Sequence, residues 1–311
     1  MTTVLLFGAS GFLGRYVRAS LAPHADLVCP SRSACDLVAS DVTALASAIR
    51  AARPDAIVNC AGRVSGSGSD LIQAHTVVTA KLIDAVVAAA PGARFLRIGS
   101  AAEYGRVPHG AVVREDHTAV PISEYGVSQL AATHLADIAG RSGRVDTIVL
   151  RVFNPVGAGL PATSLLGHTA HSLRRAMARG SDYVEIGLLD SHRDFVDVRD
   201  VASAVRAAVF APSDISSRVF NVASGRTVTL REAVETLVTV SGFPGEVRTG
   251  TPSAHAARSA GVGWMRGDIT TIARELAWRP TYELIDSLKF LWADTEPVPG
   301  DSGTSLPGGR G

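Results

Sequence analysis

A glycine-rich turn near the N-terminus constrains the fold more than any other feature of this sequence. A short apolar run, Val4–Phe7, leads into Gly8-Ala9-Ser10-Gly11-Phe12-Leu13-Gly14, where glycine recurs at every third position. After a strand, the first glycine permits a tight turn, the second lets backbone approach a pyrophosphate, and the third lets a helix pack closely. We predict a dinucleotide site here, with a helix over residues 15–21 pointing its first amides at the phosphates. The alternative is a glycine-rich turn without a ligand.

Strand-like and helix-like runs alternate after this turn. The predicted strands are 27–29, 56–60, 95–98 and 147–152, and the predicted helices are 42–52, 71–90 and 127–140. This alternation predicts an α/β fold, a Rossmann-like doubly wound parallel sheet with a smaller C-terminal substrate-binding lobe. We assign residues 1–156, with 191–222 returning, to the dinucleotide-binding domain. Residues 157–190 and 223–293 form the lobe, and 294–311, rich in Pro and Gly, form a disordered tail.

Composition narrows the classes of partner. The chain has 311 residues, 46% of them hydrophobic, and a formal net charge of +1, so it has no basic field for nucleic acid. The three cysteines have no metal-ligand spacing, and we expect reduced thiols and no metal. No apolar run in the sequence reaches the roughly 18 residues that span a bilayer. We therefore expect a cytoplasmic protein that binds small molecules and no membrane.

The end of the second predicted strand bears on which dinucleotide is bound. A carboxylate there accepts hydrogen bonds from a free ribose 2′-hydroxyl, whereas a basic residue accommodates a 2′-phosphate. This chain has Ser31-Arg32-Ser33, and no acid before Asp36. We predict NADP(H) in preference to NAD; Arg32 as an ordinary solvated side chain is the alternative. Asp36-Leu37 is expected to border the adenine, and Ala61-Gly62 to let backbone approach the cofactor.

Several motifs in order resemble one enzyme family. Gly8–Gly14, Ser100, Tyr125 and the string Arg193-Asp194-Phe195-Val196-Asp197-Val198-Arg199-Asp200-Val201 together look like the extended short-chain dehydrogenase/reductase family, which includes NAD-dependent epimerases and dehydratases. The resemblance extends to about Trp292. Two further segments, Arg151–Pro155 and Leu276–Pro280, resemble GDP-6-deoxy-4-keto-sugar reductases in particular.

The resemblance implies roles for individual residues. Ser100 would polarise a substrate carbonyl, Tyr125 would pass a proton to or from its oxygen, and Asn154 and Val156 would lie beside the nicotinamide. The chain departs from the family at Gln129, where a lysine would hold the nicotinamide ribose. Glutamine can make that hydrogen bond but carries no charge.

The departure at Gln129 has a directional consequence. A lysine one helical turn after Tyr125 would lower the pKa of the phenol from its reference value of about 10. Without it Tyr125 stays protonated near neutral pH, which suits a proton donor in ketone reduction and disfavours alcohol oxidation. We hypothesise that His75, or a water chain touching it, returns the proton to Tyr125. The alternative is a structural histidine, with its hydrogen bonds made on a helix face or in a subunit contact.

Two arginines bear on the substrate. In relatives, the arginine corresponding to Arg193 and one near the position of Arg266 bind the diphosphate of a nucleotide-sugar, and paired guanidinium donors suit phosphate oxygens. The alternative is a structural partnership of Arg193 with Asp197 or Asp200. Apolar residues of the lobe could instead enclose an apolar ring system or form core: Leu160, Leu165, Leu166, His168 and Leu188.

Together these features predict an NADPH-dependent ketoreductase for a nucleotide-linked 4-keto-6-deoxy sugar. Dehydration is disfavoured because no acid pair directly follows Ser100, where Ala101 and Ala102 stand. One alternative is a ketoreductase or isomerising enzyme for a polyketide or other specialised metabolite. The other is a non-catalytic NADP-binding protein. By resemblance, helices 71–90 and 127–140 would pair across a two-fold axis in a homodimer.

Overall fold

Successive residues of each central strand are buried on opposite sides of one parallel sheet. In β1 (Thr2–Phe7), Val4 and Leu6 join one hydrophobic cluster, and Leu5 and Phe7 join the other. This period of two is what a strand covered on both faces requires. The computed structural model describes residues 1–187, 189–250 and 261–296.

The sheet has six parallel strands in the order β10-β5-β4-β3-β1-β2. The other strands are β2 (Ala25–Val28), β3 (Ala56–Asn59), β4 (Arg94–Ser100), β5 (Asp146–Val152) and β10 (Val219–Val222). The chain moves from β1 outward to β2, then crosses back to β3 on the other side of β1. Ligands bind at such a reversal, outside the carboxyl ends of the strands. The predicted fold class is confirmed, and the glycine-rich turn lies at this reversal.

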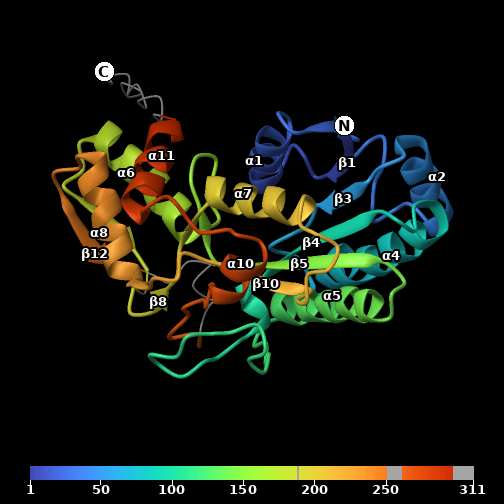
Figure 1. Ribbon diagram of the computed structural model, residues 1–311. Coiled ribbons are helices and arrows are strands. Elements are labelled where there is room, and N and C mark those ends of the chain that lie inside the picture. Colours follow the sequence, from blue (N-terminus) through green and yellow to red (C-terminus); the bar gives the residue numbers. More distant parts are fainter. Residues whose placement is uncertain (188, 251–260, 297–311) are drawn as a thin grey trace, which may run out of the picture.

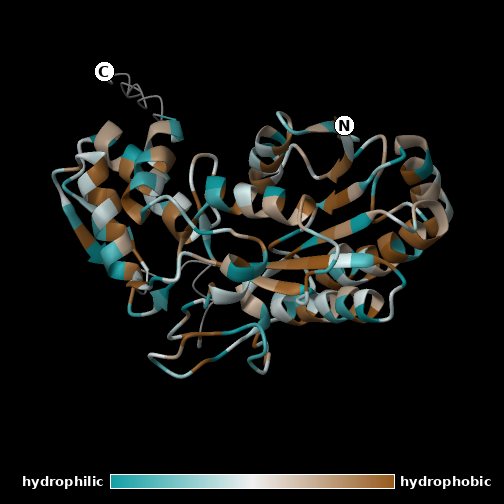
Figure 2. Ribbon diagram, viewed as in Figure 1, coloured by the Kyte–Doolittle hydropathy of each residue, from teal (hydrophilic) through white to brown (hydrophobic). Residues whose placement is uncertain are grey.

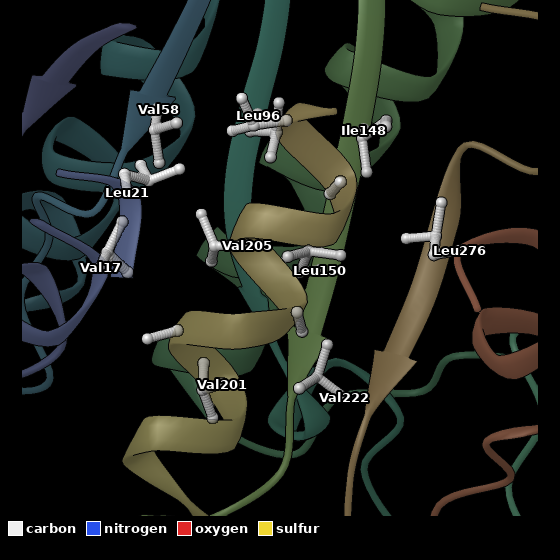
Figure 3. Packing of buried hydrophobic residues seen from close by; sticks show 14 of the residues in the cluster. Val17, Leu21, Val58, Leu96, Ile148, Leu150, Val201, Val205, Val222 and Leu276 are labelled. Carbon is white, nitrogen blue, oxygen red and sulfur yellow. The ribbon is translucent and has the colours of Figure 1, made fainter. Parts of the chain in front are cut away.

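Helices cover both faces of the sheet (Figure 1). One face carries α1 (Phe12–Leu21) and α7 (Val198–Val209), and the other carries α2 (Val42–Ala52), α4 (Val78–Ala89) and α5 (Glu124–Arg141). Figure 3 shows α7, with Val201 and Val205, lying against the strands that carry Leu96 and Leu150, and all four residues belong to one cluster. The hydropathy colours agree, because the central strands are mostly hydrophobic (Figure 2).

The helix predicted over residues 71–90 is longer and interrupted. It comprises α3 (Gly68–Ile72), a π-helical turn η1 (Gln73–Val77) and α4, and this continuous helix of 22 residues is long and apolar enough to cross a membrane by length and composition alone. The expectation that no segment would reach that length was wrong. Half of its most apolar stretch of 18 residues is buried inside the protein, as in the core helix of a globular domain.

A third hydrophobic cluster lies apart from the two that cover the faces of the sheet. It is built from α6 (Leu165–Arg179), α8 (Leu230–Ser241) and α11 (Leu284–Asp294), which Figure 1 shows together on the left. The short strand pairs here are β7 (Tyr183–Ile186) with β12 (Glu246–Thr249) and β8 (His192–Arg193) with β11 (Val228–Thr229). The remaining elements are η2 (Ala101–Glu103), β6 (Pro155–Val156), β9 (Val196–Asp197) and α10 (Thr270–Glu275).

Two predictions fall partly outside the described residues. Leu188, one of the predicted apolar residues of the lobe, is outside them, and so is most of the predicted tail, residues 297–311. Of the tail, only residues 294–296 are described; Asp294 ends α11.

Candidate active site

The glycine-rich turn packs so tightly that two of its glycines cannot be replaced. Gly8 has a φ of +75°, and a Cβ there would lie 2.5 Å from the backbone nitrogen of Ala61 at the end of β3. A Cβ on Gly14 would lie 1.9 Å from the carbonyl oxygen of Gly8. The first glycine therefore lets β1 turn against β3, and the last lets α1 pack against that turn, as the sequence predicted.

The N-terminus of α1 is left open to a ligand. Gly11 is its N-cap residue, is exposed, and makes no side-chain capping bond, so the first amides of the helix keep donor capacity. Ser10 is exposed beside it. Phe12 and Leu13 are half-buried, the former edge-to-face with Tyr16. These residues fit a pyrophosphate held at a helix N-terminus.

Arg32 is free to meet a ligand at the end of β2. Its side chain is 85% exposed, and its partner is Asp36, whose Oδ2 lies 3.0 Å from Arg32 Nε. Hydrogen bonds from Arg32 and from two backbone amides lower the pKa of the Asp36 carboxyl. Ser31 Oγ lies 2.8 Å from Ser33 Oγ. An exposed ion pair of this kind is weak, so Arg32 can exchange Asp36 for a phosphate.

Leu37 and Val156 have their side chains in the core. Leu37 is 7% exposed, packed with the helices beneath the sheet, and Val156 is 1% exposed in the cluster of the second lobe. Only their backbones are left for a cofactor. Asn154, next to Val156, donates from Nδ2 to the carbonyl oxygen of Asp194 at 2.8 Å, which ties β6 to the later string of charged residues.

The structure brings Ser100, Tyr125 and Gln129 together. Ser100 ends β4, and Tyr125 and Gln129 lie one turn apart on α5; both Ser100 and Gln129 hydrogen-bond the Tyr125 hydroxyl. Burial raises the pKa of Tyr125 above its ordinary value, although these two hydrogen bonds and the charge of Arg97 oppose the rise. The phenol is therefore protonated at neutral pH, and this protonation suits a proton donor.

His75 belongs to the same group. It lies in the π-helical turn, with its ring 5.5 Å from that of Tyr125 at an interplanar angle of 84°. Its Nδ1 is 3.2 Å from Gln129 Nε2, and its Nε2 is 2.8 Å from the carbonyl oxygen of Arg63. Burial lowers the pKa of His75, so the ring is neutral at pH 7. A Cβ on Gly62 would lie 2.9 Å from the ring, which explains a glycine there.

Sequence reasoning missed one charged residue of this site, Arg97. It lies in β4, is 2% exposed, and donates to Gln129 Oε1 from Nη2 and to Thr133 Oγ1 from Nη1 at 2.9 Å. The signal was present, because an arginine interrupts the apolar strand Phe95–Ile98. A charge there is buried when the sheet is covered on both faces.

Each aspartate of the arginine-aspartate-phenylalanine string has a structural partner. Asp194 accepts bonds from the backbone of Ser224, Gly225 and Gly267. Burial raises the pKa of Asp194 to about 6. Asp197 caps α7 and pairs with Arg199. Further contacts hold the C-terminal segment: Asp200 accepts from the backbone of Thr281 and Tyr282, and Trp278 donates to Ser203 Oγ.

Arg193 has no ion-pair partner among the described residues. It is 6% exposed, and its hydrogen bond is from Nη1 to the carbonyl oxygen of His192 at 2.9 Å. Within the described ranges no carboxylate pairs with it, and Asp197 and Asp200 are bound elsewhere, so the structural partnership considered from the sequence is not formed. Burial lowers the pKa of Arg193 to about 10.

Arg266 lies across a shared loop from Arg193. Its Nε donates to the carbonyl oxygen of Gly225 at 2.8 Å, and Val228, three residues later, pairs with Arg193 in the β8–β11 ladder. Arg266 is half-buried, and no carboxylate in the described part of the chain forms an ion pair with it. Of the predicted apolar residues of the lobe, Leu165 and Leu166 are core, Leu160 packs against them, and His168 is half-buried on α6.

Comparisons with known proteins show the family to which the chain belongs. Residues 4–223 match the model of the "NAD dependent epimerase/dehydratase family". The chain is 35% identical to dTDP-6-deoxy-L-talose 4-dehydrogenase (NAD(P)(+)) of Kitasatospora kifunensis, over 95% of this chain and 96% of that protein. It is 29% identical to GDP-6-deoxy-D-mannose reductase of Pseudomonas aeruginosa, over 93% and 95% of the two chains.

A solved structure is similar over almost the whole chain. RMD from Pseudomonas aeruginosa complexed with NADPH superposes with a TM-score of 0.79 at 25% identity, over 94% of this chain and 97% of that one. The chain therefore belongs to the NAD-dependent epimerase/dehydratase family of extended short-chain dehydrogenases/reductases, which modify nucleotide-linked sugars, and it is an NAD(P)-dependent oxidoreductase.

Proposed function

We propose that this enzyme reduces the carbonyl of a nucleotide-linked 4-keto-6-deoxy sugar with NADPH. The observation that carries the proposal is the Tyr125 hydroxyl, hydrogen-bonded to Ser100 and Gln129 in surroundings that keep it protonated. Bound NADPH would supply the hydride. Ser100 donates a hydrogen bond to the carbonyl oxygen, and Tyr125 gives that oxygen its proton as the alcohol forms.

The unpaired arginines support a diphosphate in the substrate. Arg193 is a buried cation whose charge no described carboxylate balances, and a phosphate would balance it with charge-assisted hydrogen bonds. Arg266 lies across the loop at Gly225. The two relatives named above carry dTDP- and GDP-linked 6-deoxy sugars in their names. We infer that the sheet holds the cofactor and that the second lobe, with these arginines, holds the nucleotide.

The surroundings of Ser100 argue against dehydration. The first carboxylate after it is Glu103, which is completely buried and is bound by the Ser100 amide and by Arg151. It has no free oxygen facing a substrate carbon. A base for removing a proton beside the carbonyl is therefore lacking at this position.

The test is a panel of carbonyl compounds with one nicotinamide readout. We expect oxidation of NADPH, followed by the loss of its absorbance, with dTDP- or GDP-linked 4-keto-6-deoxy sugars. The matched control is the same keto sugar without its nucleoside diphosphate, which lacks the groups that Arg193 and Arg266 would bind. Equal turnover of the free ketone would instead favour a specialised metabolite as substrate.

We also propose NADPH as the preferred cofactor, and Arg32 as the residue that selects it. Arg32→Ala is expected to raise the KM for NADPH by about 10-fold, because the loss of one charge-assisted hydrogen bond weakens binding by about that factor. The KM for NADH should stay nearly unchanged. Steady-state kinetics with both cofactors measure this. Arg18→Ala, which removes an exposed arginine of α1, serves as the control. A parallel loss with both cofactors would show that Arg32 does not recognise the 2′-phosphate.

We propose a homodimer formed by the exposed sides of α5 and of the helix 68–89. Three large apolar residues are exposed there: Val87 of the helix 68–89 by 38%, and Val127 and Ile138 of α5 by 47% and 55%. A second copy would cover them by pairing the same helices across a two-fold axis. Light scattering is expected to give twice the chain mass of 32.3 kDa, and Val127→Glu to give the single mass.

We place the enzyme in the cytoplasm. Cys29, Cys35 and Cys60 are free thiols, and burial raises the pKa of each, which keeps them in the unreactive thiol form. Such thiols suit a reducing compartment. Cell fractionation followed by immunoblotting tests the location, and recovery in the membrane fraction would contradict it.

A further inference from the structure

A buried guanidinium lies behind the proton donor. Arg97 follows Phe95 by two residues in β4, so both side chains lie on the same face of the sheet. This is the face that α5 covers. Its terminal nitrogens end on two side chains of that helix, Gln129 and Thr133. A cation so deep in a protein costs free energy unless a nearby negative charge compensates it.

The nearest carboxylate does not neutralise Arg97. Glu103 Oε1 lies 3.9 Å from Arg97 Nη1, but Oε2 accepts from Arg151 Nε at 2.7 Å, and Oε1 accepts from the Ser100 amide at 2.9 Å. Two guanidiniums thus share one carboxylate, and the group keeps a net positive charge. The Tyr125 hydroxyl lies within the field of this charge.

Arg97 also fixes the orientation of Gln129. Because Gln129 Oε1 accepts from Arg97, Nε2 is turned toward His75 Nδ1, 3.2 Å away. His75 Nε2 faces a carbonyl oxygen, that of Arg63, so the ring carries its proton on Nε2 and accepts at Nδ1. The amide therefore directs its N–H groups to the side of His75 and Tyr125, where the phenol oxygen meets a donor.

We propose that Arg97 is the positioning residue of this active site: it holds the Gln129 amide and supplies the positive charge that stabilises Tyr125 as a phenolate. The proposal rests on the proposed function. Bound NADPH would supply hydride to the carbonyl carbon; Tyr125 gives its proton to the carbonyl oxygen, so that its own O–H bond breaks and the O–H bond of the alcohol forms. The phenolate left behind takes its next proton from water.

The charged groups around Tyr125 act in opposite directions. Arg97, from β4, favours the phenolate, and Glu103, from η2, opposes it. Gln129 from α5 and Ser100 from β4 contribute neutral hydrogen bonds, and His75 from η1 is neutral. Arg97 is therefore the cation whose removal should be felt at the phenol oxygen.

The test measures ionisation at residue 125 without any substrate. Tyr125 is replaced by 3-fluorotyrosine, whose phenol ionises at lower pH, and the ¹⁹F shift is followed against pH. Arg97→Met is expected to raise the midpoint by about one pH unit, a tenfold change in the ionisation constant. Arg97→Lys keeps the charge and should stay near the parent value. The double variant Arg97→Met/Gln129→Lys returns a cation to the site and should restore the midpoint.

A buried arginine of the same strand provides the control. Arg94 is 7% exposed and pairs with Asp146 at 2.7 Å at the far end of β4. Arg94→Met should lower stability and leave the midpoint unchanged. An unchanged midpoint in folded Arg97→Met would overturn the proposal. If Arg97→Met does not fold, the double variant decides: a midpoint about one unit below the parent value there would overturn the proposal, because the introduced lysine would then be adding a charge to a site that had lost none.

The kinetic readout separates positioning from structure. With a substrate in hand, Arg97→Met should lower kcat by about 10-fold with little change in KM, and the double variant should recover most of it. The ¹⁹F midpoint needs no turnover. A failure of the proposed substrate would therefore leave that result standing, and the two failures are distinguishable.

Discussion

Arg193→Met is expected to stabilise the protein and to weaken its substrate binding. Burial lowers the pKa of Arg193 to about 10, which corresponds to a cost on the order of 3 kcal/mol for keeping the charge in the folded state. Methionine keeps much of the side-chain volume without the charge. We expect the melting temperature to rise by about 5 °C and the KM for a diphosphate-linked substrate to rise by about 10- to 100-fold.

The matched control is Arg199→Met, six residues further along the string. Arg199 pairs with Asp197 through two hydrogen bonds of 2.9 and 2.8 Å, so its removal leaves a buried carboxylate unpaired. That variant should melt at a lower temperature with an unchanged KM. Calorimetry and steady-state kinetics on both variants give the comparison. A lower melting temperature with unaltered KM for Arg193→Met would make Arg193 a structural residue.

The sequence was sufficient for the architecture because local patterns and the global fold agree. The glycine spacing at residues 8–14 admits one packing of strand, turn and helix, and the two close approaches at Gly8 and Gly14 realise it. Buried strands of a parallel sheet are continuous apolar runs, so they were recognisable without an alternating pattern. The interruption of helix 68–89 by a π-helical turn was not predictable, because no proline or glycine marks it.

The site was only partly predictable, because charge compensation is a property of three-dimensional neighbours. Ser100, Tyr125 and Gln129 were recognised from their spacing and resemblance to a family. Arg97 was not recognised, because its role depends on which face of β4 it occupies and on which side chains of α5 lie against that face. The string after Arg193 shows the same limit: Asp197 and Asp200 were considered as partners for the arginine, but Asp197 pairs with Arg199, and Asp200 is bound by the backbone of the segment after Trp278.

The pH profile of Tyr125 should show which direction of the reaction the site favours. Reduction of a ketone consumes one proton, so the ratio of the oxidation rate to the reduction rate must rise about tenfold per pH unit by thermodynamics. The protonation state of Tyr125 decides whether the oxidation rate or the reduction rate changes with pH. Because burial raises the pKa of Tyr125, the phenol keeps its proton from pH 6 to 9. Reduction should therefore be level over that range, and oxidation of the alcohol should rise about tenfold per unit.

Tyr125→Phe identifies the group responsible. The variant should lose about 10²- to 10⁴-fold in kcat/KM in both directions. Without the phenol, oxidation should become level with pH and reduction should fall as pH rises, because thermodynamics fixes the ratio of the two rates. Initial rates in both directions, with the cofactor saturating and the substrate concentration varied, measure the effect. Ser100→Ala, which removes a hydrogen bond and no titrating group, should lower the rates while keeping the slope. A reduction rate that falls above pH 7 in the parent enzyme would show a phenol ionising near neutrality, and the net charge supplied by Arg97 would then exceed the cost of burying the phenolate.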